Sequence, residues 1–168
     1  PKPIIIYNVP SRTGCNMLPE TVARIADSCS NVTGIKEASG NISQVAKLAS
    51  LVGDRLDIYS GNDDQIVPVM SLGGSGVISV LANLLPKNIH DITKEMLNGN
   101  YIKAKNEQLA YEKLIEMLFA EVNPIPVKAA LYMMGMDVGP VRLPLTELEE
   151  THKIELKRAM SEAGIRSL

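Results

Sequence analysis

Short apolar segments alternate regularly with longer amphipathic ones along the first half of the sequence, and this pattern leaves few possible folds. Four apolar segments have the length and composition of β-strands: Pro3–Asn8, Val32–Glu37, Leu56–Ser60 and Gly76–Val80. Segments with helical spacing lie between them, at residues 19–29, 41–52 and 63–72. The unit repeats roughly every 25 residues, as the βα units of a parallel sheet do. We therefore predict an α/β protein whose strands run parallel.

Local signals support these elements. Pro19 suits the first turn of a helix, and Asn41 suits the N-terminal cap of the helix that runs to about Val52. The segment Pro3–Asn8 is almost continuously apolar, which is typical of a strand buried on both faces. A domain seldom begins inside a buried strand, and the chain has no initiator Met. We therefore expect an N-terminal part of the domain to be missing from this chain.

After Val80 the pattern is helical only. The periodicity predicts four more helices: Asn88–Leu97, Tyr101–Phe119, Ile125–Met134 and Thr146–Ala163. Right-handed βα crossovers leave two architectures for the first part, an open doubly wound sheet or a (β/α)8 barrel. The helices after Val80 would then form an addition to either one.

The position of the Gly-rich stretch Leu72–Gly76 separates these architectures. It precedes a strand, so it lies away from the edge at which α/β proteins bind ligands, and we interpret it as a tight turn rather than a phosphate loop. A barrel needs eight strands in about 250 residues, and this chain offers about four. We predict the second half of a (β/α)8 TIM barrel in residues 1–85, where about four βα units begin, and the last barrel helix with a C-terminal helical extension in residues 86–168.

Composition excludes several classes of partner. Seventeen Lys and Arg against nineteen Asp and Glu give a formal charge of −2, which argues against nucleic acid and polybasic membrane surfaces. No apolar run approaches the roughly 20 residues that span a bilayer. Cys15 and Cys29 cannot form a disulfide framework, so a cytoplasmic setting is the default. His90 and His152 lack metal-ligand spacing, and we expect no metal site.

Lys36 is the most informative residue. Side chains alternate along a strand, so Val32, Gly34 and Lys36 are expected on one face, with Ile35 and Glu37 on the other. If Ile35 packs against the helices, Lys36 points into the barrel. Removal of a lysine amine from water favours its neutral form, which is a nucleophile toward carbonyl groups and can form a Schiff base. The alternative is a lysine that extends from the strand end to solvent.

Two further residues lie at the same edge of the predicted sheet. Tyr7 ends the first strand and shares a face with Ile5, so its phenol could pass protons to and from an imine. It could equally be an ordinary amphipathic core tyrosine. Arg12 lies in the loop just after that strand and suits bidentate pairing with a substrate carboxylate, unless it is only a solvated loop charge.

Two segments carry a family resemblance, Tyr7–Gly14 (YNVPSRTG) and Gly34–Gly40 (GIKEASG). They resemble the dihydrodipicolinate synthase branch of the pyruvate-dependent class I aldolase/lyase family. Supporting stretches follow in family order and cover nearly all of the chain: YSGND at 59–63, GVISV at 76–80, NPIPVK at 123–128 and RLP at 142–144. The resemblance implies a (β/α)8 barrel with a C-terminal helical extension, usually assembled as a homodimer or homotetramer.

The resemblance also implies a reaction and its residues. Pyruvate would condense with L-aspartate 4-semialdehyde through a lysine Schiff base, forming 4-hydroxy-tetrahydrodipicolinate in lysine and diaminopimelate biosynthesis, without a cofactor. Lys36 matches the Schiff-base lysine, Tyr7 the proton-relay tyrosine and Arg12 the arginine that holds the semialdehyde carboxylate. Gly61 and Ile78 match positions whose backbone lines the pyruvate pocket.

The resemblance places the family's first four strands outside this chain. With them go the threonine of the proton relay, a second tyrosine contributed across the dimer, the loop that binds the pyruvate carboxylate and most of the lysine feedback site. Two alternatives therefore stay open. One is a sister Schiff-base aldolase acting on another aldehyde, such as a sialic-acid lyase or a keto-deoxy-sugar aldolase, and the other is an inactive half-barrel fragment that associates with the missing N-terminal half.

Overall fold

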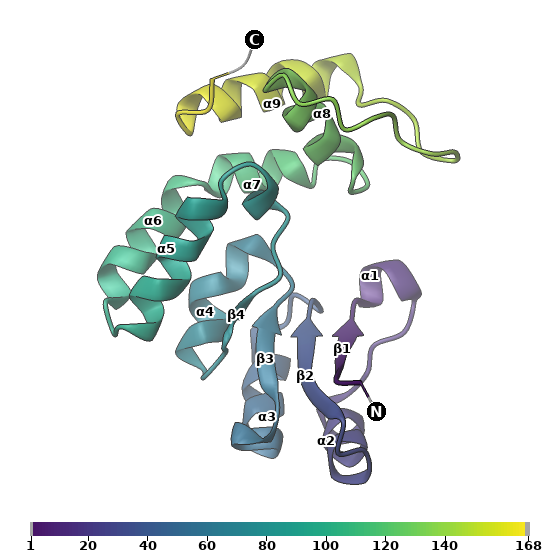
Figure 1. Ribbon diagram of the computed structural model, residues 1–168, viewed down its shortest axis with the longest axis vertical. Coiled ribbons are helices and arrows are strands. Elements are labelled where there is room, and N and C mark those ends of the chain that lie inside the picture. The colour runs from purple at the N-terminus through teal and green to yellow at the C-terminus, as the bar shows by residue number, and fades with distance from the viewer. Residues whose placement is uncertain (1, 167–168) are drawn as a thin grey trace. The chain divides into compact units, whose positions relative to one another are not determined.

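The described part of the chain, residues 2–166 of the computed structural model, contains one parallel sheet in the order β1–β2–β3–β4 (Figure 1). The strands are β1 (Ile4–Asn8), β2 (Val32–Glu37), β3 (Asp57–Ser60) and β4 (Gly76–Val77). This confirms the prediction of a parallel α/β sheet. β4 is shorter than the predicted strand, although the Ile78 N–H still donates to the Ser60 carbonyl at 2.9 Å.

The chain folds as two compact units. The first runs to Ser79 and includes residues 93–101, and the second consists of residues 80–92 and the chain from Ile102 onward. The predicted division at residues 85 and 86 refers to a complete barrel and stays a prediction.

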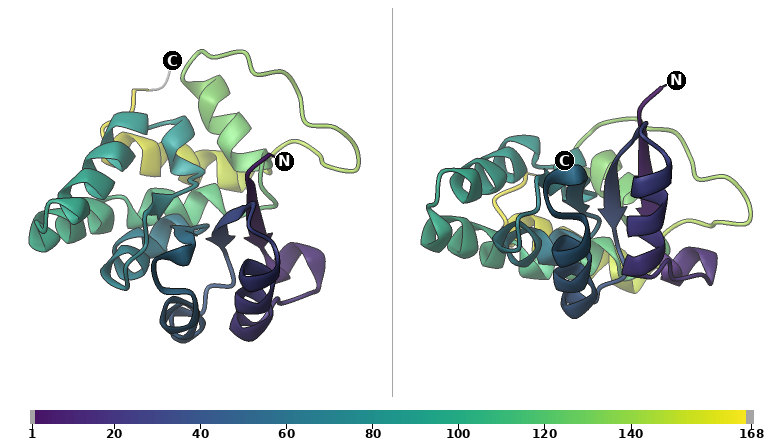
Figure 2. Two further views of the ribbon diagram at one scale, coloured as in Figure 1. Left: turned by 60° about the horizontal axis from the view of Figure 1, so that its bottom comes forward. Right: turned by 90° about the horizontal axis from the view of Figure 1, so that it is seen from below.

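The core of the first unit lies between the sheet and two helices, α2 (Pro19–Ser28) and α3 (Ile42–Val52), which pack side by side (Figure 2). Ile35 of β2 is fully buried in this core, as predicted. The predicted cap of α3 is also confirmed, because the Asn41 side chain accepts a hydrogen bond from the Gln44 N–H at 3.1 Å. Burial of this apolar face fixes which face of the sheet points away from the helices.

The prediction that the first strand is buried on both faces is wrong in this structure. Ile4 is 48% exposed and Ile5 is 49% exposed, whereas Ile6 packs against the core. β1 is an edge strand, and among the described residues only β2 pairs with it. Its second face therefore has no covering layer in residues 2–166, although its composition suits one.

The expected alternation along β2 also fails at one point. Ile4 pairs with Val32 and Ile5 pairs with Gly34, so Thr33 is an extra residue on β2. Such a bulge reverses the side-chain alternation locally. Val32 consequently joins Ile35 in the core instead of sharing the face of Lys36.

Helix boundaries differ from the predictions in two places of the first unit. The predicted helix at 63–72 is a 3-10 turn, η2 (Asp63–Gln65), followed by α4 (Ile66–Ser71). The turn after β1 contains a single helical turn that was not predicted, α1 (Pro10–Thr13). A further 3-10 turn, η1 (Gly53–Arg55), joins α3 to β3.

The second unit is helical, as predicted. Its elements are η3 (Leu81–Asn83), the first part of α5 (Pro86–Leu97), α6 (Tyr101–Ala110), α7 (Glu112–Leu118), α8 (Ile125–Met133) and α9 (Glu150–Glu162). Leu114 and Leu118 of α7 are buried, as are Leu156 and Met160 of α9. These side chains explain why α9 packs against α7 and α8.

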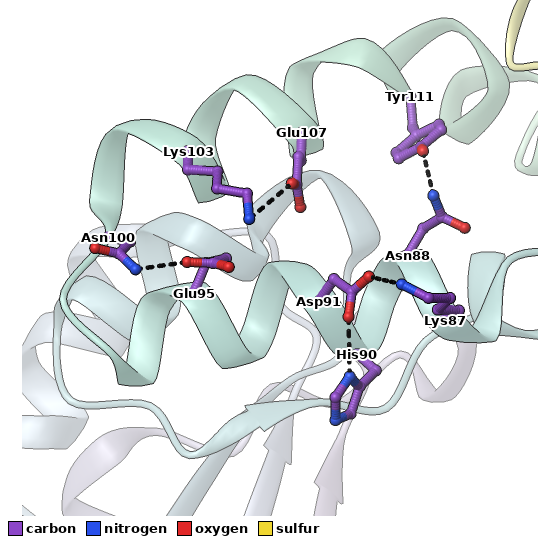
Figure 3. Close-up of polar contacts among 9 residues, drawn as sticks. All are labelled: Lys87, Asn88, His90, Asp91, Glu95, Asn100, Lys103, Glu107 and Tyr111. Atoms are coloured by element: carbon purple, nitrogen blue, oxygen red, sulfur yellow. Dashed lines mark hydrogen bonds and ion pairs between the residues drawn. The ribbon is translucent and has the colours of Figure 1, made fainter.

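The predicted single helix 101–119 is interrupted at Tyr111. Asn88 of α5 donates a hydrogen bond to the Tyr111 hydroxyl at 2.6 Å (Figure 3). In the same part of α5, Lys87 pairs with Asp91, whose other oxygen contacts His90 (Figure 3). The Asn88 contact holds the tyrosine at the break between α6 and α7.

Helices long and apolar enough to cross a bilayer are absent from residues 2–166.

Candidate active site

The carboxyl ends of the first three strands bring one row of side chains together. Tyr7 of β1 pairs in register with Lys36 of β2, and Lys36 pairs with Tyr59 of β3. Residues in register on neighbouring strands point to the same face of a sheet. That face is opposite to the one on which Ile35 packs against the helices, so the orientation predicted for Lys36 agrees with the structure.

Lys36 and Tyr7 are in direct contact. The Lys36 Nζ lies 4.3 Å from the centroid of the Tyr7 ring. The lysine is partly buried, and Tyr7 is 48% exposed. A cation over an aromatic face is attracted by the ring's quadrupole, and the contact places the Lys36 amine beside the Tyr7 ring at the strand end.

Tyr59 is a neighbour of Lys36 that the sequence reasoning missed. Its ring lies between two glycines, and a Cβ built on Gly34 would be 3.5 Å from the Tyr59 Cε2. A Cβ built on Gly76 would be 3.8 Å from the Tyr59 Cδ1. The glycines on the adjacent strands leave room for the ring to lie across the sheet beside Lys36. The available signal was a glycine on each strand adjacent to the one that carries Tyr59, although only Gly76 pairs with it in register.

Arg12 lies in α1, the turn that follows β1 at the carboxyl edge of the sheet (Figure 1). The Thr13 hydroxyl donates to the Val9 carbonyl at 3.1 Å and accepts from the Cys15 N–H at 3.2 Å. Gly14 ends the turn with φ +68°, a conformation that favours glycine. The backbone around Arg12 is therefore well defined, while its side chain is exposed.

Gly61 and Ile78 continue the hydrogen-bond ladder beyond the strands. The Gly61 N–H donates to the Glu37 carbonyl at 2.8 Å, and Ile78 is bonded to β3 as described above. A Cβ on Gly61 would approach the Ala38 Cβ to 2.5 Å, closer than real Cβ atoms come. Glycine is thus required at position 61 by the close approach of two chain segments, whatever the site binds.

A buried polar pair, which was not predicted from the sequence, lies behind this edge. Asn8 is 2% exposed and Glu37 is 3% exposed, and the Asn8 Nδ2 donates to the Glu37 Oε2 at 2.9 Å. Glu37 was expected to face the helix layer, and its contact with Gln44 of α3 at 3.4 Å agrees with that expectation. Its partner Asn8, 29 residues away in sequence, was not anticipated.

A second group of titratable side chains lies in the helical unit. His152, which looked isolated in the sequence, has its Nδ1 2.7 Å from the Glu121 Oε1, and Glu149 completes a group whose ligand atoms lie within 4.8 Å of one another. The Glu149 N–H donates to the same Glu121 oxygen at 3.0 Å. The hydrogen bond with Glu121 raises the pKa of His152 above its ordinary 6.5, and the bond with His152 lowers the pKa of Glu121 below its ordinary 4.5.

These pKa shifts predict a pH-dependent contribution of the His152–Glu121 pair to stability. A raised histidine pKa stabilises the fold fully below about pH 6.5, and the stabilisation is lost as the pH rises through the shifted value. A lowered carboxyl pKa stabilises the fold fully above about pH 4.5, and this stabilisation is lost as the pH falls through the lowered value. The pair should therefore contribute most between these two values, with Glu149 and Glu155 adding to the field on the histidine.

A double-mutant cycle with His152→Gln and Glu121→Gln measures this coupling by thermal unfolding. We expect a favourable coupling at pH 5.5 that becomes small at pH 9. An equal coupling energy at both pH values would contradict a pH-dependent interaction between His152 and Glu121.

Comparison with known proteins shows similarity over nearly the whole chain. The model of the dihydrodipicolinate synthetase family matches residues 1–163. The chain is 55% identical to the 4-hydroxy-tetrahydrodipicolinate synthase of Clostridium tetani over 95% of its length, and 59% identical to that of Caldicellulosiruptor saccharolyticus over 97%. These alignments cover 54% and 55% of the relatives, so the chain spans about half the length of the curated relatives it matches.

Solved structures of the same family are also similar to this chain. The crystal structure of dihydrodipicolinate synthase from Thermotoga maritima matches with a TM-score of 0.93 and 42% identity, over 96% of this chain and 56% of that one. The predicted fold class, the second half of a TIM barrel followed by a helical extension, is confirmed.

Proposed function

The chain belongs to the dihydrodipicolinate synthetase family, and we propose that it carries the Schiff-base half of a pyruvate-condensing active site. The observation that supports the proposal most directly is the contact of the Lys36 amine with the Tyr7 ring at the carboxyl edge of a parallel sheet. Active sites of (β/α)8 barrels lie at this edge.

In the proposed reaction the Lys36 amine adds to the ketone carbon of pyruvate. The carbinolamine then loses water to give an imine, with Tyr7 supplying and accepting protons. The positively charged imine nitrogen draws electrons from the adjacent methyl group, which loses a proton to form an enamine. The enamine carbon attacks the aldehyde carbon of L-aspartate 4-semialdehyde, and the aldehyde oxygen takes up a proton. These bond changes require neither a metal nor an organic cofactor.

Arg12 is proposed to select the aldehyde by pairing with its carboxylate. Its guanidinium is suited to bidentate binding, and its backbone is fixed by the turn α1. The backbone at Gly61 and Ile78 is proposed to line the pyruvate pocket. The amino group of the semialdehyde moiety then attacks the imine carbon, closes a six-membered ring and displaces the Lys36 amine, which returns to its free form. The product would be 4-hydroxy-tetrahydrodipicolinate, an intermediate of lysine and diaminopimelate biosynthesis.

The relatives are almost twice as long as this chain, so the proposed activity belongs to the complete barrel. Ile4, Ile5 and Tyr7 of the edge strand β1 are each about half-exposed, and we propose that a first barrel half would cover this edge. We propose a cytoplasmic enzyme that works as a homodimer or homotetramer and binds neither nucleic acid nor membranes.

A substrate comparison tests the function. The complete protein is expected to condense pyruvate with L-aspartate 4-semialdehyde with a kcat/KM at least about a hundredfold higher than with uncharged sugar aldehydes, because only the semialdehyde offers a carboxylate to Arg12. Product formation can be followed by NMR. A preference for N-acetylmannosamine or a keto-deoxy-sugar precursor would favour the sister aldolases, and absence of any turnover by the complete protein would contradict the proposed function.

A further inference from the structure

The buried pair Asn8–Glu37 is outside the proposed chemistry, yet it lies directly behind it. Each residue follows a proposed catalytic one, Asn8 after Tyr7 and Glu37 after Lys36, and each points to the opposite face of the sheet. Burial of a carboxylate costs free energy unless hydrogen-bond donors surround it. The donors around Glu37 therefore indicate which groups the carboxylate orients.

Glu37 accepts hydrogen bonds from three directions. The Asn8 Nδ2 lies 2.9 Å and 3.2 Å from its two oxygens, the Ser39 N–H donates to Oε1 at 2.7 Å, and the Gln44 Nε2 approaches Oε2 at 3.4 Å. All of these groups are donors. The carboxylate therefore requires Asn8 to present its NH2 group and to turn its carbonyl oxygen away.

The orientation imposed on Asn8 closes the loop that carries Arg12. The Asn8 Oδ1 accepts from the Met17 N–H at 2.9 Å, and its Nδ2 also donates to the Asn16 Oδ1 at 3.0 Å. The loop leaves β1 at Val9 and returns at Met17, so one side chain fixes both of its ends. A reversed Asn8 amide would place two donors against each other at Met17.

The return arm of the loop is also tied to α3. Asn16 and Gln44 exchange two hydrogen bonds, with Asn16 Nδ2 donating at 2.8 Å and Gln44 Nε2 donating at 3.1 Å. Since Gln44 contacts Glu37 as well, the carboxylate is the common point of the strand end, the loop and the helix.

We propose that Glu37 is a positioning residue that, through Asn8, sets the placement of the Arg12 loop and thereby the affinity of the site for the aldehyde substrate. The inference rests on the proposed function for Arg12. Substitutions at Glu37 are therefore expected to weaken binding of the aldehyde substrate without affecting imine formation with pyruvate.

The first test is Glu37→Gln in the complete protein. The new amide keeps its oxygen on the Ser39 N–H but turns its NH2 group toward the NH2 groups of Asn8 and Gln44. We expect the KM for aspartate semialdehyde to rise about tenfold, with kcat and the KM for pyruvate changing less than about threefold. Asp57→Asn is the matched control, because Asp57 also accepts a side-chain hydrogen bond, from Ser75 at 2.8 Å, but at the opposite end of the sheet.

A swapped pair separates positioning from simple loss of a buried charge. Asn8→Asp combined with Glu37→Gln restores one donor and one acceptor between the two positions and keeps an acceptor for the Met17 N–H. We expect the double variant to recover at least about a third of the lost aldehyde affinity. If Glu37→Gln does not fold, Gln44→Ala replaces it, with an expected rise of about threefold in the same KM.

Trypsin gives a readout independent of activity. Cleavage after Arg12 reports how well the loop is held, and we expect Glu37→Gln to accelerate it about tenfold while Asp57→Asn leaves it unchanged. Faster cleavage in a protein without imine formation would overturn the proposed function alone. Unchanged cleavage, an equal fall in activity toward both substrates, or a swapped pair without recovery would overturn the positioning role of Glu37.

Discussion

Replacement of Lys36 by alanine is expected to abolish condensation, with a fall in kcat on the order of a thousandfold or more. The covalent route needs an amine at this position, and its neighbours Tyr7 and Tyr59 offer no replacement nucleophile for an imine. Steady-state product formation from pyruvate and aspartate semialdehyde measures the loss.

Two companion variants make the Lys36 result specific. Lys36→Arg keeps a cation that can lie over the Tyr7 ring but has no amine able to form an imine, so it should be as inactive as the alanine variant. Lys47→Ala removes an exposed lysine of α3 and should retain full activity. Retention of more than about a tenth of the activity in Lys36→Ala or Lys36→Arg would contradict the proposed role.

Replacement of Arg12 by alanine is expected to raise the KM for aspartate semialdehyde about thirty- to a hundredfold and to leave imine formation with pyruvate nearly unchanged. The expected size follows from the loss of a charge-assisted bidentate pair, which contributes about 2 to 3 kcal/mol. The KM should rise less in Arg12→Lys, because lysine retains the positive charge although it lacks the forked geometry of arginine.

The control for Arg12 is Arg24→Ala, which removes an exposed arginine of α2 in the same unit. It should leave both Michaelis constants unchanged. Unchanged semialdehyde kinetics in Arg12→Ala would show that another group binds the carboxylate, and would favour a sister aldolase with a different aldehyde.

Periodicity was sufficient for the architecture of the first unit because parallel βα units repeat both in sequence and in space. It failed where neighbours decide the outcome. The Ile-rich β1 has the composition of a doubly covered strand but is half-exposed in residues 2–166, where only β2 pairs with it. The break at Tyr111 coincides with a hydrogen bond from Asn88 to the tyrosine hydroxyl, which no local pattern reveals.

In the candidate site, too, local patterns predicted some residues, whereas contacts between distant segments were not predicted. Strand alternation was enough to place Lys36 and Tyr7 on one face, and the chain order was enough to place Arg12 at the carboxyl edge. Asn8 with Glu37, Tyr59 with its glycines, and His152 with Glu121 are pairs between distant segments. Which residues meet in these pairs depends on strand register and on packing. A single sequence does not reveal such contacts, because it does not give the register.

Reductive trapping shows whether the amine of Lys36 captures pyruvate. The complete protein is incubated with pyruvate and borohydride, digested, and its peptides are mapped by mass spectrometry. We expect one stable adduct, on Lys36. An adduct on any other lysine, or no adduct in the complete protein, would contradict the proposed role of Lys36.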